Sequence, residues 1–138
     1  MGRILAVDYG RKRVGIAVSD PLKIIANGLT TVHSKDIFDF LDDYLKKESV
    51  ETIVVGYPTD LQDRATDITA DVNSFLKKLN ERYTDIDIET ADERFTSKMA
   101  GQTMLDSGLK KMQRRNKALL DEISATIILQ SYMSANQL

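Results

Sequence analysis

The sequence predicts an α/β protein: a mixed five-stranded sheet with helices on both of its faces. Three observations support this fold class: paired apolar runs near the N-terminus, a β-branched apolar run in the middle of the chain, and amphipathic helical patterns between the later strands. The 138 residues are 42% hydrophobic and 29% charged, which suits one domain with an ordinary core. Because we find no linker or repeat, residues 1–138 are expected to form a single domain.

The first three strands are expected over residues 4–7, 14–18 and 29–32. The first two are short apolar runs separated by a polar segment that contains Gly10, and this pattern predicts a β-hairpin. A loop is predicted before the third strand by its turn-forming residues, Pro21, Asn27 and Gly28.

Helices and strands alternate in the rest of the chain. Ser34 is the expected N-cap of a helix whose apolar side chains recur at helical spacing up to Leu45. A strand covered on both faces follows at 52–56, and then an amphipathic helix with an apolar stripe at Ile68, Val72, Phe75, Leu76 and Leu79. Residues 86–90 alternate as a strand does.

Two helices are expected at the C-terminal end. Thr96 is the expected cap of a helix that stops near Gly108. The last helix is predicted from about Asn116 to Ser134, with apolar residues over much of its circumference, so it should be well buried.

Residue usage excludes several classes of site. Cysteine is absent and His33 is the only histidine, which argues against thiolate and zinc sites, Cys/His proteases and Ser-His-Asp hydrolases. Any metal must then be held by oxygens, as Mg²⁺, Mn²⁺ or Ca²⁺ are. His33 precedes a predicted helix without a second histidine, and a structural or solvent-facing role is expected for it.

Three acids stand at positions where a carboxylate calls for an explanation. Asp8 ends the first apolar run, Glu93 follows the strand at 86–90, and Asp121 heads an apolar stripe of the last helix. A turn residue, an exposed ion pair and a helix-dipole contact are the respective structural alternatives. Together, three such carboxylates suit a pair of divalent ions that hydrolyse a phosphodiester, with Mg²⁺ or Mn²⁺ as the expected cofactor.

Basic residues are clustered although the formal net charge is −2. Nucleic acid on either side of a scissile phosphate needs cations, and solvated loops are the structural alternative. The candidate nucleic-acid-binding residues are Arg11, Lys12, Arg13, Arg94, Lys98, Lys110, Lys111, Arg114 and Arg115.

Several motifs in order along nearly the whole chain resemble the YqgF (RuvX) family of pre-16S rRNA nucleases. They are Ile4-Leu5-Ala6-Val7-Asp8-Tyr9-Gly10, Arg13 to Asp20, Gly56-Tyr57-Pro58, Asp92-Glu93-Arg94-Phe95-Thr96-Ser97 with Ala100, and Asp121-Glu122-Ile123-Ser124-Ala125 leading into Ile128-Leu129-Gln130. The chain departs from the family at 59–64: after Gly-x-Pro the family usually continues with Asn-Met-Asp-Gly, whereas this chain has Asp60-Leu61-Gln62-Asp63-Arg64 after Thr59.

The resemblance implies a ribonuclease H-like fold and a role in maturing the 5′ end of small-subunit ribosomal RNA. The family's catalytic, metal-binding acids map onto Asp8, Glu93 and Asp121. The N-terminus lacks the pattern of a signal peptide and no run approaches transmembrane length, so a cytoplasmic protein without a membrane partner is expected.

Three other functions compete with rRNA processing. A DNA-junction resolvase would use the same chemistry on branched DNA. An Asp-x-Gly hairpin also occurs in actin-like ATPases and sugar kinases, but those bind ATP between two such domains, and this chain lacks both common phosphate-loop motifs. A noncatalytic rRNA-binding adaptor could keep the fold, although three carboxylates near a phosphate backbone would weaken its binding.

Overall fold

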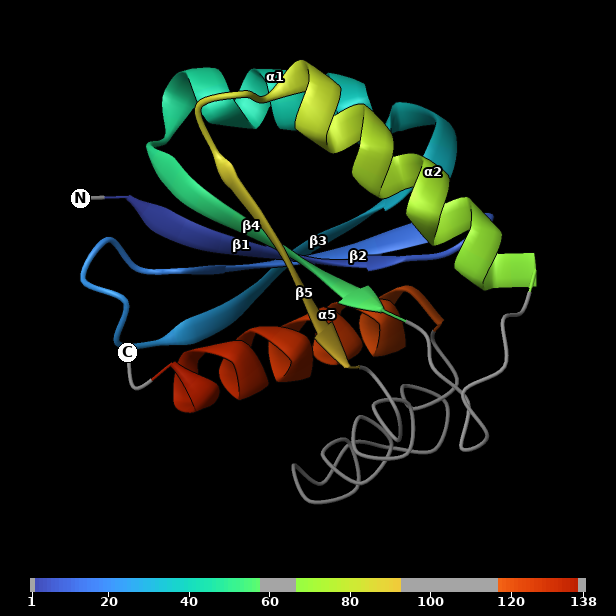
Figure 1. Ribbon diagram of the computed structural model, residues 1–138. Coiled ribbons are helices and arrows are strands. Elements are labelled where there is room, and N and C mark those ends of the chain that lie inside the picture. Colours follow the sequence, from blue (N-terminus) through green and yellow to red (C-terminus); the bar gives the residue numbers. More distant parts are fainter. Residues whose placement is uncertain (1, 58–66, 93–116, 137–138) are drawn as a thin grey trace.

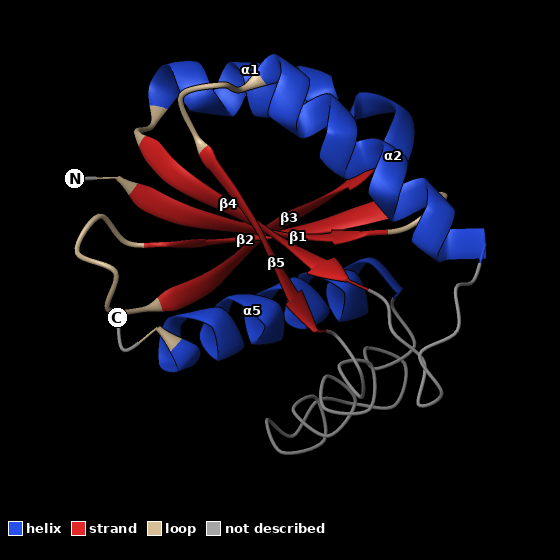
Figure 2. Cartoon of the chain, viewed as in Figure 1, coloured by secondary structure: helices blue, strands red, loops and turns tan. Residues whose placement is uncertain are grey.

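A mixed sheet separates two helical layers in the computed structural model, which describes residues 2–57, 67–92 and 117–136 (Figure 1; Figure 2). The strands are β1 (Arg3–Tyr9), β2 (Arg13–Ser19), β3 (Ala26–His33), β4 (Val50–Tyr57) and β5 (Asp87–Asp92). The helices are η1 (Ser34–Asp36), α1 (Ile37–Lys47), α2 (Asp67–Arg82) and α5 (Lys117–Ala135). The helix expected between Thr96 and Gly108 lies outside the described residues.

The five strands lie in the order β3-β2-β1-β4-β5. β2 is antiparallel to both β1 and β3, whereas β4 is parallel to both β1 and β5. The predicted mixed sheet with an antiparallel hairpin at one side is therefore confirmed. Since β1, β4 and β5 run in the same direction, their carboxyl ends share one edge of the sheet, and α5 begins on that side (Figure 1).

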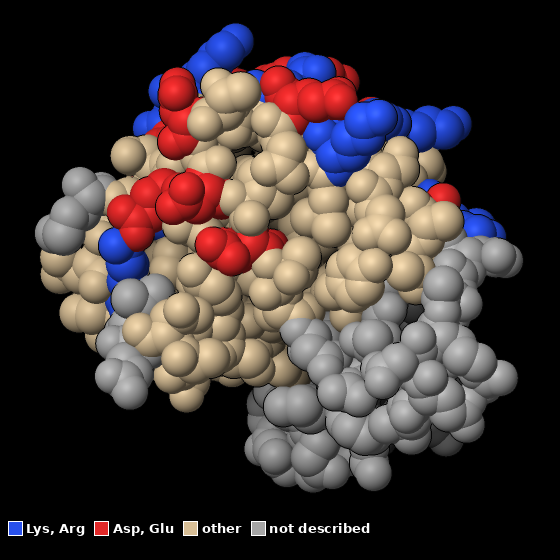
Figure 3. Space-filling view, in the orientation of Figure 1, with Lys and Arg blue, Asp and Glu red and all other residues tan. Residues whose placement is uncertain are grey.

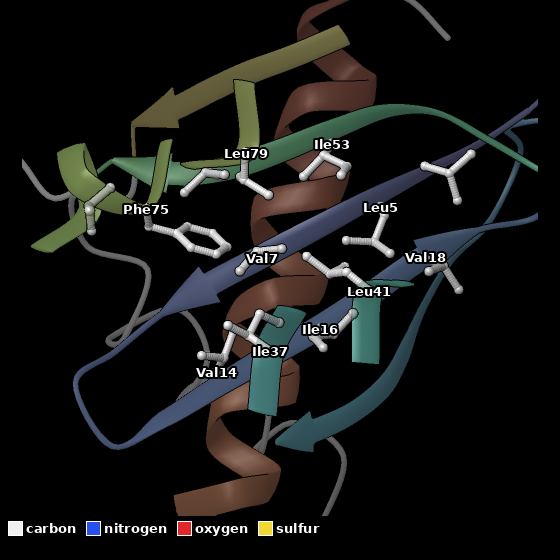
Figure 4. Packing of buried hydrophobic residues seen from close by; sticks show 13 residues of the cluster. Leu5, Val7, Val14, Ile16, Val18, Ile37, Leu41, Ile53, Phe75 and Leu79 are labelled. Atoms are coloured by element: carbon white, nitrogen blue, oxygen red, sulfur yellow. The ribbon is translucent and has the colours of Figure 1, made fainter. Parts of the chain in front are cut away.

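One face of the sheet packs against α1 and α2. Alternate residues of β1 and β2, among them Val7 and Ile16, point into this layer, where they meet Ile37, Leu41 and Phe75 (Figure 4). Each of these five side chains is at most 2% exposed. Complete burial of one such side chain contributes about 1.5–3 kcal/mol, so this layer contributes substantially to stability.

The opposite face of the sheet packs against α5. Its strand residues are smaller and include Ala6 and Ala17, which contact a cluster around Ile128 and Leu129 of the helix. Short side chains shorten the distance between a helix and a sheet because less volume fills the space between them. This close packing brings the beginning of α5 to the site described below.

The structure corrects two expectations at β3. The strand begins at Ala26 rather than at residue 29, so Asn27 and Gly28 belong to the strand and not to the preceding loop. Gly28 faces α5, and a Cβ at this position would lie 3.3 Å from Thr126 Oγ1. The glycine therefore allows α5 to pack closely on the strand. Local sequence cannot distinguish a glycine with this role from a glycine in a turn.

The helical segment after β3 also begins differently from the prediction. His33, rather than Ser34, caps η1, because His33 Nδ1 accepts a hydrogen bond from the Lys35 backbone N–H at 3.1 Å. The expected structural, solvent-facing role of His33 agrees with this exposed position. None of the helices in the described part of the chain combines the length and apolar character that a membrane crossing requires.

An ion pair joins the two helices of the first layer and makes their packing sensitive to acid. Arg82 and Tyr83 donate hydrogen bonds to Asp42 and lower its pKa from 3.8 to about 2. A carboxylate with a lowered pKa stabilises the folded state above its unfolded pKa, and this contribution disappears as pH falls through the folded value.

We therefore expect Asp42→Asn to destabilise the protein at neutral pH, with the difference from wild type shrinking between about pH 4 and pH 2. Urea unfolding over this range measures the difference. Asp43→Asn, a neighbouring exposed change that leaves Arg82 paired, is the control. A difference that stays constant with pH would contradict this account of the ion pair.

Candidate functional site

Asp8 lies near the carboxyl end of β1, on the face covered by α5. Ala6 belongs to the cluster that packs against α5, and side chains two residues apart on a strand point to the same face. Asp8 is partly buried and lies opposite Gly15 of β2 in the antiparallel pair. Its carboxylate therefore lies at the sheet edge where the three parallel strands end.

Gly15 is next to both Asp8 of β1 and Asp121 of α5. A Cβ built on Gly15 would lie 2.1 Å from the Asp121 carbonyl oxygen and 3.0 Å from the Asp121 Cβ. The helix thus lies directly against the strand at this glycine, and no side chain fits between them. Asp8 is the partner of Gly15 in the neighbouring strand, and Asp121 lies over Gly15 on the helix. Two acids 113 positions apart in the sequence are therefore both adjacent to one glycine.

Arg13 fixes the orientation of the Asp121 side chain. Its Nε donates a hydrogen bond of 2.8 Å to Asp121 Oδ2, and the two side chains are 40% and 23% exposed. Arg13 and Gly15 are on the same face of β2, which points toward α5. At this exposure the ion pair contributes at most about 1 kcal/mol to stability, so its main effect is on side-chain geometry.

The donor set at this edge fits a hard divalent cation. Asp8 and Asp121 offer carboxylate oxygens, which Mg²⁺ and Mn²⁺ prefer. A carboxylate has about four lone-pair sites, so the hydrogen bond from Arg13 leaves Asp121 able to bind a cation as well. Within residues 2–57, 67–92 and 117–136, no group of three or more potential metal-binding side chains occurs. A three-carboxylate site thus requires an acid from elsewhere in the chain.

Of the other predicted site residues, two lie in the β1–β2 turn and the rest lie outside the described residues. Arg11 is 60% exposed and donates a hydrogen bond of 2.7 Å to Asp71 Oδ2, while Lys12 is exposed. The remaining candidates lie outside the described residues: Glu93, Arg94, Lys98, Lys110, Lys111, Arg114 and Arg115. β5 ends at Asp92, immediately before Glu93 in the sequence, at the same edge as β1.

Charge is distributed unevenly over the described surface. In Figure 3, most of the visible Lys and Arg side chains lie over the α1–α2 layer, whereas Asp and Glu also extend over the β5 side. The near-neutral net charge of −2 therefore conceals local differences. Local potential governs contact with a phosphate backbone more than net charge does.

Sequence reasoning did not find the spacing role of Gly15 or the partner of Arg13. Gly15 has a recognisable signal, because glycine inside an apolar strand often marks close approach of another backbone. Arg13 was predicted to bind nucleic acid, and the structure pairs it with Asp121, which makes it a positioning residue for that carboxylate. This pairing spans 108 positions and has no local sequence signal.

Curated relatives match the chain over almost its whole length. A protein of Bacteroides fragilis named "Putative pre-16S rRNA nuclease" is 53% identical over 138 residues, which is 100% of both chains. A protein of the same name from Flavobacterium psychrophilum is 54% identical over 134 residues, covering 97% of this chain and 98% of the relative.

Solved structures with low sequence identity share the fold. The Fowlpox virus resolvase, solved with substrate Holliday junction DNA, aligns with a TM-score of 0.58 at 11% identity over 99% of each chain. T. thermophilus RuvC, solved with a Holliday junction substrate, aligns with a TM-score of 0.56 at 14% identity over 99% of this chain and 96% of that one. The predicted ribonuclease H-like fold is thus confirmed.

The family comparison agrees with the relatives and with the fold. The model of the RuvX family, described as Holliday junction resolvase, matches residues 2–135. That range includes Asp8, Gly15 and Asp121, which form the described part of the site. Given this match and relatives more than 50% identical over at least 98% of their length, the chain belongs to the RuvX family.

Proposed function

We propose that this protein is a divalent-metal-dependent nuclease of the cytoplasm that processes the 5′ end of pre-16S rRNA, with residues 1–138 as one nuclease domain. Membership of the RuvX family supports the nuclease class, and the full-length relatives named for pre-16S rRNA support the substrate. The observation that carries the proposal is the convergence of Asp8 and Asp121 on either side of Gly15.

In this proposal Asp8, Asp121 and Glu93 are the catalytic acids and would hold a pair of divalent cations. Glu93 follows directly on the last residue of β5, the strand that ends at the same edge as β1, which supports its inclusion. When bound, Mg²⁺ or Mn²⁺ would stabilise charge on the scissile phosphate and activate a water molecule.

The chain's own residues have separate tasks. Asp8 and Asp121 bind the cation from a strand and from a helix, both of which are rigid elements. Arg13 holds the Asp121 carboxylate in one orientation. Gly15 sets the distance between the two acids, because nothing larger fits between β2 and α5.

A cleavage assay with two substrates tests the proposal. Wild-type protein with Mg²⁺ or Mn²⁺ is expected to cut a 5′-extended small-subunit rRNA precursor, and chelation by EDTA is expected to abolish the reaction. A four-way DNA junction in a parallel reaction should remain uncut. RNA cleavage that persists in EDTA would contradict the metal requirement.

Branched DNA is the second candidate substrate, because the matching family is described as Holliday junction resolvase. Cleavage of the four-way junction alone would replace the rRNA proposal with this function. Binding of RNA by folded protein without cleavage of either substrate would instead indicate a noncatalytic adaptor.

The basic segment at 110–117 is proposed to hold the RNA backbone. Substituting Lys110, Lys111, Arg114 and Arg115 together by alanine is expected to weaken RNA binding and its salt dependence. Each lost phosphate contact lowers the slope of log K against log salt by about 0.7 for single strands, so four contacts lower it by about 3. Fluorescence anisotropy at several salt concentrations measures the slope, and an unchanged slope and affinity would contradict the assignment.

A further inference from the structure

A cavity lies on the face of the sheet opposite Asp121, between the end of β1 and the two helices of the first layer. It has a volume of about 360 Å³, within the usual range for small-ligand sites of about 300–1,000 Å³. Its polar lining consists of Tyr9, Ser34, Lys35, Asp71, Ser74 and Lys78.

The cavity combines a cationic rim with an aromatic floor. Lys35 of η1 and Lys78 of α2 are exposed at the rim, and the carboxylate of Asp71 is paired with Arg11 at 2.7 Å. The charge of Asp71 is therefore offset, and the two lysines give the rim a net positive charge. The partly exposed rings of Tyr9 and Phe38 form this floor, and the buried Phe75 ring supports it by stacking on Tyr9 with centroids 4.4 Å apart.

The β1–β2 hairpin, which includes Asp8, is bonded to two residues that line this cavity, Ser34 and Asp71. Ser34 Oγ donates a hydrogen bond of 2.5 Å to the Arg11 carbonyl, and the Ser34 backbone N–H donates one of 3.1 Å to the Lys12 carbonyl. Together with the Arg11–Asp71 pair, these bonds tie the β1–β2 turn to η1 and to α2. The relative position of the cavity and the end of β1 is thus fixed by three interactions.

The cavity and the catalytic acids lie at the same end of β1. Tyr9 lines the cavity and follows Asp8 directly, and consecutive strand residues point to opposite faces of the sheet. A nucleic-acid strand whose scissile phosphate lies at Asp8 would therefore reach this cavity, on the other face of the sheet, by passing around the β1–β2 turn.

We propose that the cavity binds a nucleotide of a single-stranded RNA segment that flanks the cleavage site, an inference that rests on the proposed nuclease function. Lys35 and Lys78 contact the phosphate, and the base lies over the aromatic floor. Single-strand binding proteins use this combination of cations with aromatic surfaces, whereas a duplex keeps its bases stacked on each other. The chemistry thus favours a single strand over a double-stranded flank.

Binding of labelled single-stranded oligouridylate in EDTA tests the proposal without interference from cleavage. Lys35→Ala/Lys78→Ala is expected to lower the affinity about tenfold near 0.15 M salt and to reduce the salt slope by about 1.4, which corresponds to two single-strand phosphate contacts. Lys35→Arg/Lys78→Arg should retain most of the affinity because it keeps both charges. The matched control is Lys46→Ala/Lys77→Ala, which removes two exposed lysines of α1 and α2 outside the cavity.

The outcomes separate this inference from the proposed function. Equal affinity and slope for the cavity variant and the control would overturn the inference, and wild-type cleavage of the rRNA precursor would still support the nuclease. A selective loss in the cavity variant supports the binding site even if the wild type cuts no RNA, in which case only the proposed function fails. If the alanine and arginine variants bound oligouridylate equally weakly, the inference would also be overturned, because the loss of affinity would then not come from the loss of charge.

Discussion

Replacing Asp8 with Asn is expected to reduce metal-dependent RNA cleavage by at least about 100-fold while the protein stays folded. The change removes one negative charge and keeps the shape of the side chain, so the pairing of β1 with β2 is preserved. Substitutions of residues that only support a metal ligand already cost about 10–100-fold in metal affinity or activity, and loss of a ligand itself should cost no less. Initial rates at several Mg²⁺ and Mn²⁺ concentrations measure the effect.

The control for this experiment is Asp43→Asn, the same chemical change at an exposed position of α1. Asp43 is 65% exposed and pairs with Lys47, so its loss should alter neither cleavage nor stability by much. Circular dichroism and urea unfolding confirm that both variants are folded. Undiminished cleavage by the folded Asp8→Asn protein would remove Asp8 from the proposed site.

Local sequence pattern predicted the elements that position the site. The apolar run that ends in Asp8, the apolar run of β2 and the long apolar helix each appear in the structure close to the expected bounds, with α5 at Lys117–Ala135 against a prediction of 116–134. These segments are readable because each is a nearly continuous apolar run, as expected of strands covered on both faces and of a helix buried over much of its circumference.

The juxtaposition of these elements could not be predicted in the same way. Asp8 and Asp121 become neighbours only through the register of β1 with β2 and the docking of α5 on Gly15. Both depend on contacts between distant parts of the chain. The family resemblance grouped the two acids, but it contained no physical reason for their proximity, and the structure supplies that reason at Gly15.

The two incorrect predictions in and just after β3 have a common cause. Gly28 and Ser34 were interpreted from local preference, as a loop residue and as a helix cap. In the structure Gly28 makes room for α5, and Ser34 bonds the backbone of the β1–β2 turn. Each residue serves a tertiary contact that outweighs its local preference.

The second large effect is expected at Gly15. In Gly15→Ala the new methyl group would lie 2.1 Å from the Asp121 carbonyl oxygen, a backbone atom that cannot rotate away, so α5 or β2 must move by roughly 1 Å. Overpacking of this kind costs about 1–3 kcal/mol, and we expect the upper end because the clash is with backbone. A displacement of this size at the proposed active site is expected to lower cleavage by about 100-fold.

Gly28→Ala is the matched control, because it adds the same methyl group to the same face of the sheet beneath the same helix. There the nearest atom is Thr126 Oγ1 at 3.3 Å, the end of a side chain, and a shift of a few tenths of an ångström relieves the contact. We expect Gly28→Ala to change the free energy of unfolding by less than about 1 kcal/mol and to keep most of the activity. The difference between the two variants isolates the contact with Asp121 from the general cost of filling space under α5. If Gly15→Ala matched Gly28→Ala in both unfolding and cleavage, the spacing of Asp8 and Asp121 would not depend on this glycine.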